Sequence, residues 1–268
     1  MTNQDVDGKI NLLTFLERRI KMYEKSYQVD LHTHTIASGH AYNTIQEMAK
    51  AAKEKGISLL GITEHSMTMP GTCSEIYFQN LWNANRSYYG VQLLLGVELN
   101  IIDYQGSVDM SQELLANLDI AIASIHNTVG YNVGTKAQNT SAVIGAIKNP
   151  YVNIIGHPDD GRIPLDYKEV VKAAKEYHKI LEINNNSLSP TSWRENAREN
   201  DRKILELCAK EDYPVIIGSD AHADHNVGAN SYALDLMKEI QFPEHLILNY
   251  YMDELKSYIY FDARKREK

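Results

Sequence analysis

Imidazole and carboxylate side chains recur at regular intervals along this chain and could together bind metal ions. One polar residue stands at or just past the end of each of seven short apolar runs: His32, His65, Glu98, His126, His157, Asn184 and Asp220. By subtraction, the steps between them are 33, 33, 28, 31, 27 and 36 residues. These steps are close to the ~30 residues of one strand–helix unit.

Two further histidines join this series locally. His34 lies two residues after His32, and His222 lies two residues after Asp220. Alternate residues of an extended chain point to the same side, so each pair could bind one ion. Imidazoles and carboxylates without a cysteine thiolate are typical ligands of zinc, manganese and iron. The groups outnumber the four ligands of a tetrahedral ion, so we expect more than one metal.

Strands and helices that alternate along the chain must position these residues. The apolar, β-branched runs predict strands over residues 29–31, 58–62, 91–97, 119–124, 152–155, 180–183 and 215–217. Amphipathic segments at 44–55, 141–148, 166–178 and 195–210 predict helices between them. Strand then helix, repeated, favours a parallel sheet whose carboxyl ends converge on one face. The spacing of Ile10, Leu13, Leu16 and Ile20 predicts a helical extension over residues 1–28, before a single domain over 29–268.

Composition and charge narrow the function classes. The chain has 268 residues, 43% of them hydrophobic, which suffices for a large core. Its 27 basic and 35 acidic side chains give a net charge of −8, which disfavours extended nucleic acid as a partner. No apolar run approaches the ~20 residues of a membrane helix. Two cysteines, Cys73 and Cys208, and no signal-peptide pattern at the N-terminus favour the cytoplasm.

Five motifs resemble those of the PHP (polymerase and histidinol phosphatase) family. They are residues 30–34 (DLHTH), His40, residues 62–65 (ITEH), residues 156–158 (GHP) and residues 218–222 (GSDAH). The resemblance runs from about residue 29 to residue 249, and residues 37–44 and 182–187 are similar to the YcdX-like branch of small bacterial phosphatases. It implies an α/β fold, a distorted (β/α)7 barrel, with a trinuclear metal site at the C-terminal ends of the strands.

The resemblance also implies a ligand set. His32, His34 and Asp220 would hold one ion, Glu98 would bridge it to a second held by His126 and His157, and His40, His65 and His222 would hold the third. One departure is Glu64, where many relatives carry aspartate before the motif histidine; we expect it to act behind the ligands. The implied cofactors are three divalent ions, with zinc favoured and manganese or iron as alternatives.

The expected function is metal-dependent hydrolysis of phosphomonoesters. A hydroxide bridging two ions near Glu98 would attack phosphorus, and a small phosphorylated substrate is the expected partner. The proton donor to the leaving group stays unassigned, with Asp220 and His225 as candidates. Arg162, Arg194 and Arg198 are candidates for binding the substrate phosphate, with solvated surface charge as the alternative for each.

Three other functions compete with this one. A PHP-type phosphodiesterase or exonuclease would use the same metals, but the chain lacks an attached polymerase and a basic face. An amidohydrolase-like metal hydrolase also begins with His-x-His, but it commonly uses a mid-barrel lysine where this sequence has Glu98. A non-catalytic metal-binding scaffold is disfavoured by the complete ligand set. The sequence leaves the oligomeric state open, and a homo-oligomer is compatible with it.

Overall fold

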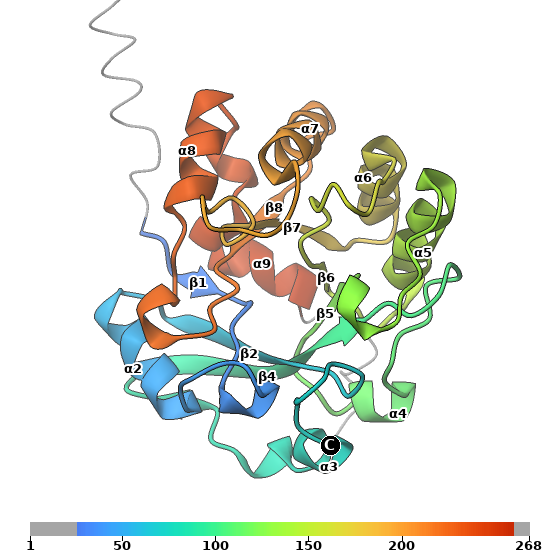
Figure 1. Cartoon of the computed structure of the whole chain (residues 1–268). Helices are drawn as coiled ribbons and strands as arrows, with labels where there is room; N and C mark the ends of the chain where they lie inside the picture. The colour runs from blue at the N-terminus through green and yellow to red at the C-terminus, as the bar shows by residue number, and fades with distance from the viewer. Residues whose placement is uncertain (1–25, 260–268) are drawn as a thin grey trace, which may run out of the picture.

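Seven parallel strands form a nearly closed barrel in this computed structural model, which describes residues 26–259. The strands are β1 (Val29–Asp30), β2 (Leu59–His65), β4 (Val91–Asn100), β5 (Ala121–Ser124), β6 (Ile154–Ile155), β7 (Ile180–Asn184) and β8 (Val215–Gly218). They pair in chain order, and the short β3 (Ser87–Tyr88) adds to β4 in antiparallel fashion. A parallel bridge between Thr33 and Ala221 links the segments that follow β1 and β8 (Figure 1). The predicted distorted (β/α)7 barrel is therefore confirmed.

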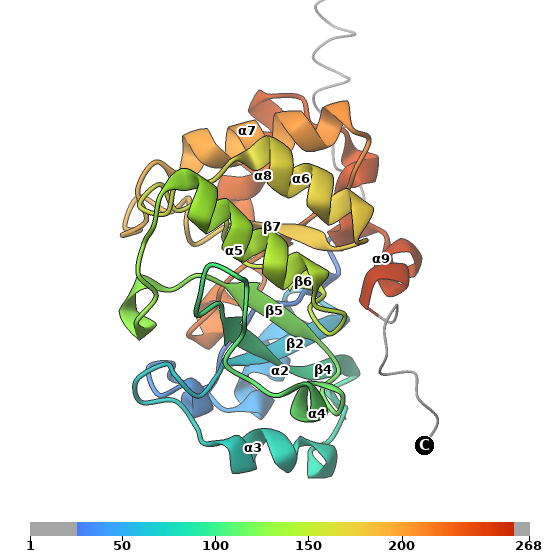
Figure 2. The same ribbon diagram turned by 90° about the vertical axis from the view of Figure 1, so that its right-hand side faces the viewer.

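Helices cover the outside of the barrel. The α-helices are α2 (Ile45–Glu54), α3 (Glu75–Gln79), α4 (Gln112–Leu115), α5 (Lys136–Lys148), α6 (Tyr167–Glu176), α7 (Ala197–Lys210), α8 (Ser231–Glu239) and α9 (Met252–Ile259). Single 3₁₀ turns occur at η1 (Ile36–Ser38), η2 (Leu81–Asn83), η3 (Asn127–Val129), η4 (Asp224–Asn226), η5 (Glu244–Leu246) and η6 (Leu248–Tyr250). Figure 2 shows α5, α6 and α7 lying side by side as one layer over the strands.

Local capping explains where several helices begin. In α2, the Thr44 side chain accepts from the backbone N–H of Glu47, whose carboxylate accepts in return from the backbone N–H of Thr44. Thr135 and Gln138 form the same capping box at the start of α5. A capping box satisfies two backbone donors that would otherwise lack partners. It starts α5 at Lys136, so the predicted beginning at residue 141 was too late.

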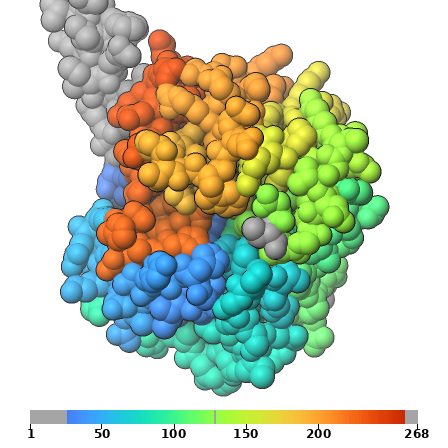
Figure 3. All heavy atoms as spheres, viewed as in Figure 1, coloured from blue at the N-terminus to red at the C-terminus, as the bar shows by residue number. Residues whose placement is uncertain are grey.

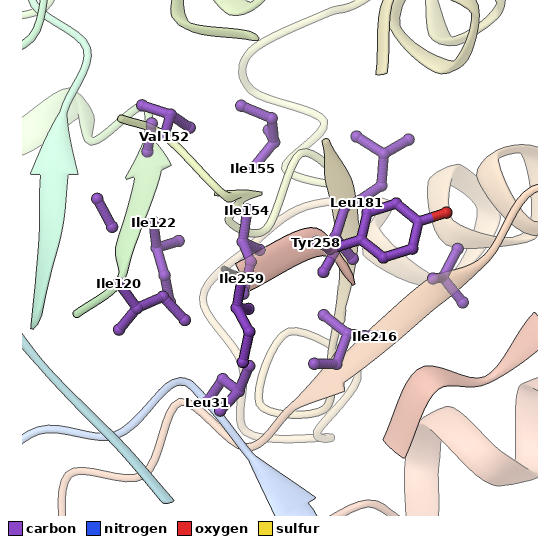
Figure 4. Packing of buried hydrophobic residues seen from close by; sticks show 14 of the residues in the cluster. Leu31, Ile120, Ile122, Val152, Ile154, Ile155, Leu181, Ile216, Tyr258 and Ile259 are labelled. Carbon is purple, nitrogen blue, oxygen red and sulfur yellow. The ribbon is translucent and has the colours of Figure 1, made fainter. Parts of the chain in front are cut away.

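The core fills the interior of the barrel and the space beneath its helices. Apolar side chains from every parallel strand belong to one buried cluster. Figure 4 shows Ile154 of β6 beside Ile259 of α9 in this cluster. Asn153, just before β6, donates from Nδ2 to the carbonyls of Tyr258 and Ile259 at 3.2 and 3.4 Å. The end of α9 therefore lies at the N-terminal ends of the strands, which leaves the opposite end for the polar residues.

Two predictions concern the ends of the chain. The helical extension predicted over residues 1–28 lies, apart from residues 26–28, outside the described residues, and the predicted domain 29–268 is described up to residue 259. Within residues 26–259, the structure contains no helix with the length and apolar character required to cross a membrane.

Candidate metal centre

The nine predicted ligands converge at the C-terminal ends of the strands. They lie on or just after β1, β2, β4, β5, β6 and β8, and His40 follows the turn η1. Three overlapping groups each place ligand atoms within 4.8 Å of one another: His34 with His65 and His222, His32 with His34 and Glu98, and His65 with Glu98 and His126. His40 and His157 join through close contacts with these groups.

Glu98 lies at the middle of the cluster and is 1% exposed. Its Oε1 lies 2.8 Å from His157 Nε2 and 3.2 Å from His126 Nε2. Its Oε2 lies 2.8 Å from His65 Nδ1 and 3.5 Å from His32 Nε2. Burial raises the pKa of Glu98, but His126, His32 and His65 outweigh this and hold it well below the ordinary value. One ionised carboxylate therefore faces imidazoles on both of its oxygens.

Four buried atoms of this cluster form no aligned hydrogen bond in the described part of the chain, although two of them, on His65 and Glu98, lie 2.8 Å apart. They are Nε2 of His32, Nε2 of His34, Nδ1 of His65 and Oε2 of Glu98. A buried polar atom left without a partner costs about 1–3 kcal/mol. Because all four are metal-ligand atoms and face one another, divalent cations would satisfy them together. The residues present therefore fit a metal centre.

A second convergence lies beside the first. His40 Nε2 is 3.2 Å from His65 Nε2 and 3.1 Å from His222 Nε2. Burial lowers the pKa of His40 most, and the nearby His65 and His222 lower it further, to about 4. At neutral pH His40 is thus neutral, and its one Nε2 atom cannot form a good hydrogen bond with both neighbours at once. A cation among the three nitrogens would accept a lone pair from each.

Hydrogen bonds behind the imidazoles fix which nitrogen carries the proton. His32 Nδ1 lies 2.7 Å from Glu182 Oε1, and His126 Nδ1 lies 2.7 Å from Asn100 Oδ1. His222 Nδ1 lies 3.0 Å from the carbonyl oxygen of Asp220. Each partner is an acceptor, so Nδ1 must donate and the lone pair of the neutral ring lies on Nε2. In all three rings that nitrogen is the one directed at the cluster.

Glu64 and Ser38 fix the position of the proton on the His34 ring. The Ser38 hydroxyl donates to Glu64 Oε2 at 2.6 Å, so it accepts from His34 Nδ1 at 3.0 Å. Glu64 also accepts from the backbone N–H of Thr35 at 3.0 Å and is fully buried. Its carboxylate thus stands behind the ligands, at the position that the sequence singled out as a departure from the family pattern.

Asn100 is oriented by Asp109. The Asn100 side chain donates from Nδ2 to Asp109 Oδ2 at 2.8 Å and to the hydroxyl oxygens of Ser66 and Thr68 at 3.0 and 2.9 Å. These three acceptors turn the amide oxygen toward His126. Neither this arrangement nor the role of Glu182 was predicted from the sequence. The available signals were the polar Asn100 two residues after Glu98 on one strand, and a charged Glu182 inside the apolar strand β7.

The backbone is constrained at two of the ligands. His157 has φ of 28° and Asp220 has φ of 53°, both in the left-handed region. Such a conformation costs non-glycine residues of order 1–3 kcal/mol and persists where surrounding contacts impose it. The N–H of His157 donates to Glu182 Oε2 at 2.8 Å, which is one such contact.

A cavity of about 510 Å³ opens above the cluster. Seven of the predicted ligands line it, together with Met69, Pro70, Asn186, Trp193 and Arg194. In the space-filling view, early and late segments of the chain, coloured blue and orange, border a recess on this face (Figure 3). The site is therefore open to a small molecule.

The three predicted substrate-binding arginines lie in different places. Arg194 lines the cavity and is 3.2 Å from Asp220, and it also donates to Ser187 at 2.8 Å. Arg162 donates from Nε to Asp160 at 2.9 Å, and its guanidinium lies 4.2 Å from the Trp193 ring centroid. Arg198 pairs with Glu239 between α7 and α8. Arg194 is thus the one that the structure brings to the metal cavity.

Comparisons with known proteins show which family and which fold this chain resembles. A family model for the PHP domain matches residues 30–188. A "probable phosphatase" of Caldicellulosiruptor bescii is 44% identical over 234 residues, covering 87% of this chain and 95% of that protein. Another from Acetivibrio thermocellus is 41% identical over 242 residues, covering 90% and 98%. The crystal structure of a histidinol phosphate phosphatase from Lactococcus lactis, complexed with zinc, L-histidinol and phosphate, has a similar fold, with a TM-score of 0.56, 16% identity and coverage of 81% and 95%.

Proposed function

The chain belongs to the PHP family, and on this premise we propose that it is a metal-dependent phosphatase that hydrolyses phosphomonoesters. The observation that carries the proposal is the set of four buried ligand atoms that form no aligned hydrogen bond, beneath an open cavity. In a purely structural cluster we would expect each buried polar atom to form such a bond.

We assign three divalent ions to the centre. His32, His34 and Asp220 would hold the first, His126 and His157 the second, and His40, His65 and His222 the third, with Glu98 bridging the first two. Glu98 Oε1 lies beside His126 and His157, and its Oε2 lies 3.5 and 3.6 Å from His32 and His34, as a bridging carboxylate should. His34 belongs to the groups of both the first and third ions, because its ring stacks on those of His65 and His222 at 4.2 and 4.3 Å. Nitrogen and oxygen donors favour zinc, with manganese or iron as alternatives.

The chemistry divides between the ions and the protein. Bound divalent ions supply Lewis acidity for phosphate oxygens and a water made acidic enough to attack phosphorus. Glu98 and Asp220 supply fixed negative charge; burial raises the pKa of Asp220, but His32, a hydrogen bond with His34 and Arg194 hold it well below the ordinary value. Arg194 positions Asp220 and adds a positive charge on the cavity wall, where it would attract a phosphate dianion. Arg162 and Arg198 remain weaker candidates for phosphate binding, because neither lines the metal cavity.

A small monoester fits better than a nucleic acid strand. A volume of about 510 Å³ is that of a small-molecule pocket. The net charge of −8 opposes a long phosphate backbone. The fold is shared with an enzyme whose structure holds L-histidinol and phosphate, a pair of small molecules.

Two free cysteines also support a cytoplasmic location.

Metal analysis combined with a hydrolysis screen tests the proposal. We expect more than one divalent ion per purified chain, hydrolysis of p-nitrophenyl phosphate well above that of bis-p-nitrophenyl phosphate or single-stranded DNA, and loss of activity on chelation that zinc or manganese restores. Faster cleavage of DNA than of monoesters would favour an exonuclease. A stoichiometry of one ion or fewer after metal is added would refute the three-metal assignment.

A further inference from the structure

A second pocket adjoins the metal cavity on the side of β7 and β8. It has a volume of about 320 Å³ and shares Asn186, Asp220 and His222 with the larger cavity. Its remaining walls come from the loop after β7 and from the segment that leads into α8. A phosphate held over the metal cluster would therefore have its esterified group within reach of this second pocket.

The lining of the second pocket is polar but almost free of net charge. Apart from Asp220 and His222, which belong to the metal centre, its walls carry amides, hydroxyls and the Tyr232 phenol. The charge of Asp220 is balanced by Arg194 at 3.2 Å. Two of the first N–H groups of α8 are not available to an anion either, because Asn185 Oδ1 accepts from the N–H groups of Tyr232 and Ala233 at 3.0 and 3.2 Å.

Several of these groups are free to bind a ligand. The side chains of Asn186, Asn226 and Ser231 have no hydrogen-bond partner among residues 26–259, and all three are exposed. Amides and hydroxyls both donate and accept, so they match the hydroxyl groups of a sugar or polyol. Tyr232, 39% exposed, offers a ring face that can cover the C–H surface of such a molecule.

Other leaving groups fit less well. A cationic group would need a carboxylate free of other partners, and the one carboxylate of the lining is already paired with Arg194. An aromatic group could stack on Tyr232, but it would leave the amides and hydroxyls of the lining without hydrogen-bond partners. Trp193, on the wall of the metal cavity, offers no second open ring, because Arg162 lies 4.2 Å and Arg194 5.4 Å from its centroid.

We propose that the second pocket holds an uncharged, polyhydroxylated leaving group, so that the substrates are phosphomonoesters of sugars or polyols. This inference rests on the proposed phosphomonoesterase function and names its substrate class. A volume near 320 Å³ lies within the range of ~300–1,000 Å³ typical of small-ligand sites. Tyr232 and Asn226 are then specificity-determining residues.

The test compares two variants with matched controls. Tyr232→Ala and Asn226→Ala alter the second pocket. Tyr177→Ala removes a tyrosine of similar exposure, 37%, at the end of α6, and Asn117→Ala removes an exposed asparagine after α4. Both controls precede strands, so they lie toward the opposite end of the barrel.

For each protein, kcat/KM is measured with glucose 6-phosphate, phosphoethanolamine and p-nitrophenyl phosphate. We expect each pocket variant to lower the ratio of the glucose 6-phosphate value to the p-nitrophenyl phosphate value by about tenfold, the equivalent of one well-made hydrogen bond, mainly through KM. The control variants should keep the wild-type ratio. Calorimetry with the phosphonate analogue of glucose 6-phosphate and with phenylphosphonate should show the same selective loss without turnover.

Unchanged ratios in both pocket variants, or a wild-type preference for phosphoethanolamine, would overturn the sugar or polyol assignment while leaving the phosphatase intact. Failure to hydrolyse any monoester, p-nitrophenyl phosphate included, would instead refute the proposed function. The two failures are therefore distinguishable.

Discussion

Replacing Glu182 with glutamine should weaken metal binding without unfolding the barrel. Glu182 is 1% exposed, and its Oε1 accepts from His32 Nδ1 at 2.7 Å. Its Oε2 accepts from the His157 N–H at 2.8 Å and from Asn184 Nδ2 at 3.1 Å. Burial raises the pKa of Glu182, but His32 beside it outweighs this and lowers the pKa, so the group is a carboxylate at neutral pH. Glutamine has the same shape but one acceptor and one donor.

Both orientations of the new amide lose an interaction. With its oxygen toward His32, the NH₂ group faces the His157 N–H, and two donors oppose each other. With its nitrogen toward His32, the imidazole proton must move to Nε2, the atom directed at the metal cluster. A hydrogen bond to a charged group is worth about 1.5–3 kcal/mol, and loss of a partner behind a ligand typically costs 10–100-fold in metal affinity. We therefore expect a loss of about 1.4–2.7 kcal/mol in zinc binding.

Zinc competition against a chelator of known affinity measures this loss directly. Melting temperatures of metal-free and zinc-loaded protein complete the assay: the increase on loading should shrink in the variant. Glu176→Gln, on the exposed side of α6, makes the same chemical change away from the site and should match wild type. A Glu182→Gln protein that bound zinc within twofold of wild type would refute the positioning role assigned to this carboxylate.

Three other predictions follow from the same geometry. His222→Asn should lower metal content and turnover, whereas His178→Asn should change neither. The His178 ring stacks on the Tyr258 ring, with 3.9 Å between centroids, and asparagine tolerates the φ of 56° found at this position. Equal activity in the two variants would contradict the ligand assignment. Burial raises the pKa of Asp201 well above its ordinary value. The folded protein therefore becomes less stable as pH rises above about 4, where Asp201 ionises in the unfolded chain but keeps its proton in the folded one. Asp201→Asn should therefore raise the melting temperature at pH 8 but hardly at pH 4, and a pH-independent effect would count against this. A Cβ at Gly218 would lie 1.9 Å from Glu182 Oε1, so Gly218→Ala should reproduce the metal-binding loss of Glu182→Gln in a chelator competition, and full zinc affinity would contradict the argument.

The order of strands was predictable because each carries a local signal. Short β-branched runs separated by helical patterns define a parallel sheet. The polar residue at the end of each run marks the end of the barrel at which the cavity lies. The ends of strands were harder to predict. β2 continues through His65 because its backbone stays paired with β4 up to His65–Glu98, and β4 continues through Asn100 because it stays paired with β5 up to Asn100–Ser124. That pairing depends on a neighbouring strand rather than on local propensity. β3 was missed for the same reason.

The groups behind the proposed ligands were harder to predict than the convergence of those ligands at one end of the barrel. A ligand at a strand end is recognisable from its position, whereas its hydrogen-bond partner comes from a distant part of the sequence. Glu182 is 150 residues from His32, and Asn100 is 26 residues from His126. No local pattern joins such pairs, and only the closed barrel brings them together. A charged residue inside an apolar strand is the one general signal that such a partner exists.

The charge balance at the open end of the barrel links the proposed metal centre to the stability of the fold. Glu98, Glu182 and Asp220 are all buried there and all have lowered pKa values, because nearby imidazole and guanidinium groups overcome the cost of burial. In the metal-free protein this places a proton on His32: burial lowers its pKa, but Glu182, Glu98 and Asp220 raise it well above the ordinary value. A proton on Nε2 occupies the lone pair that a metal ion needs, so metal binding must release it. Binding should therefore tighten as pH rises, and its free energy adds to that of folding, because the unfolded chain does not hold these ligands together.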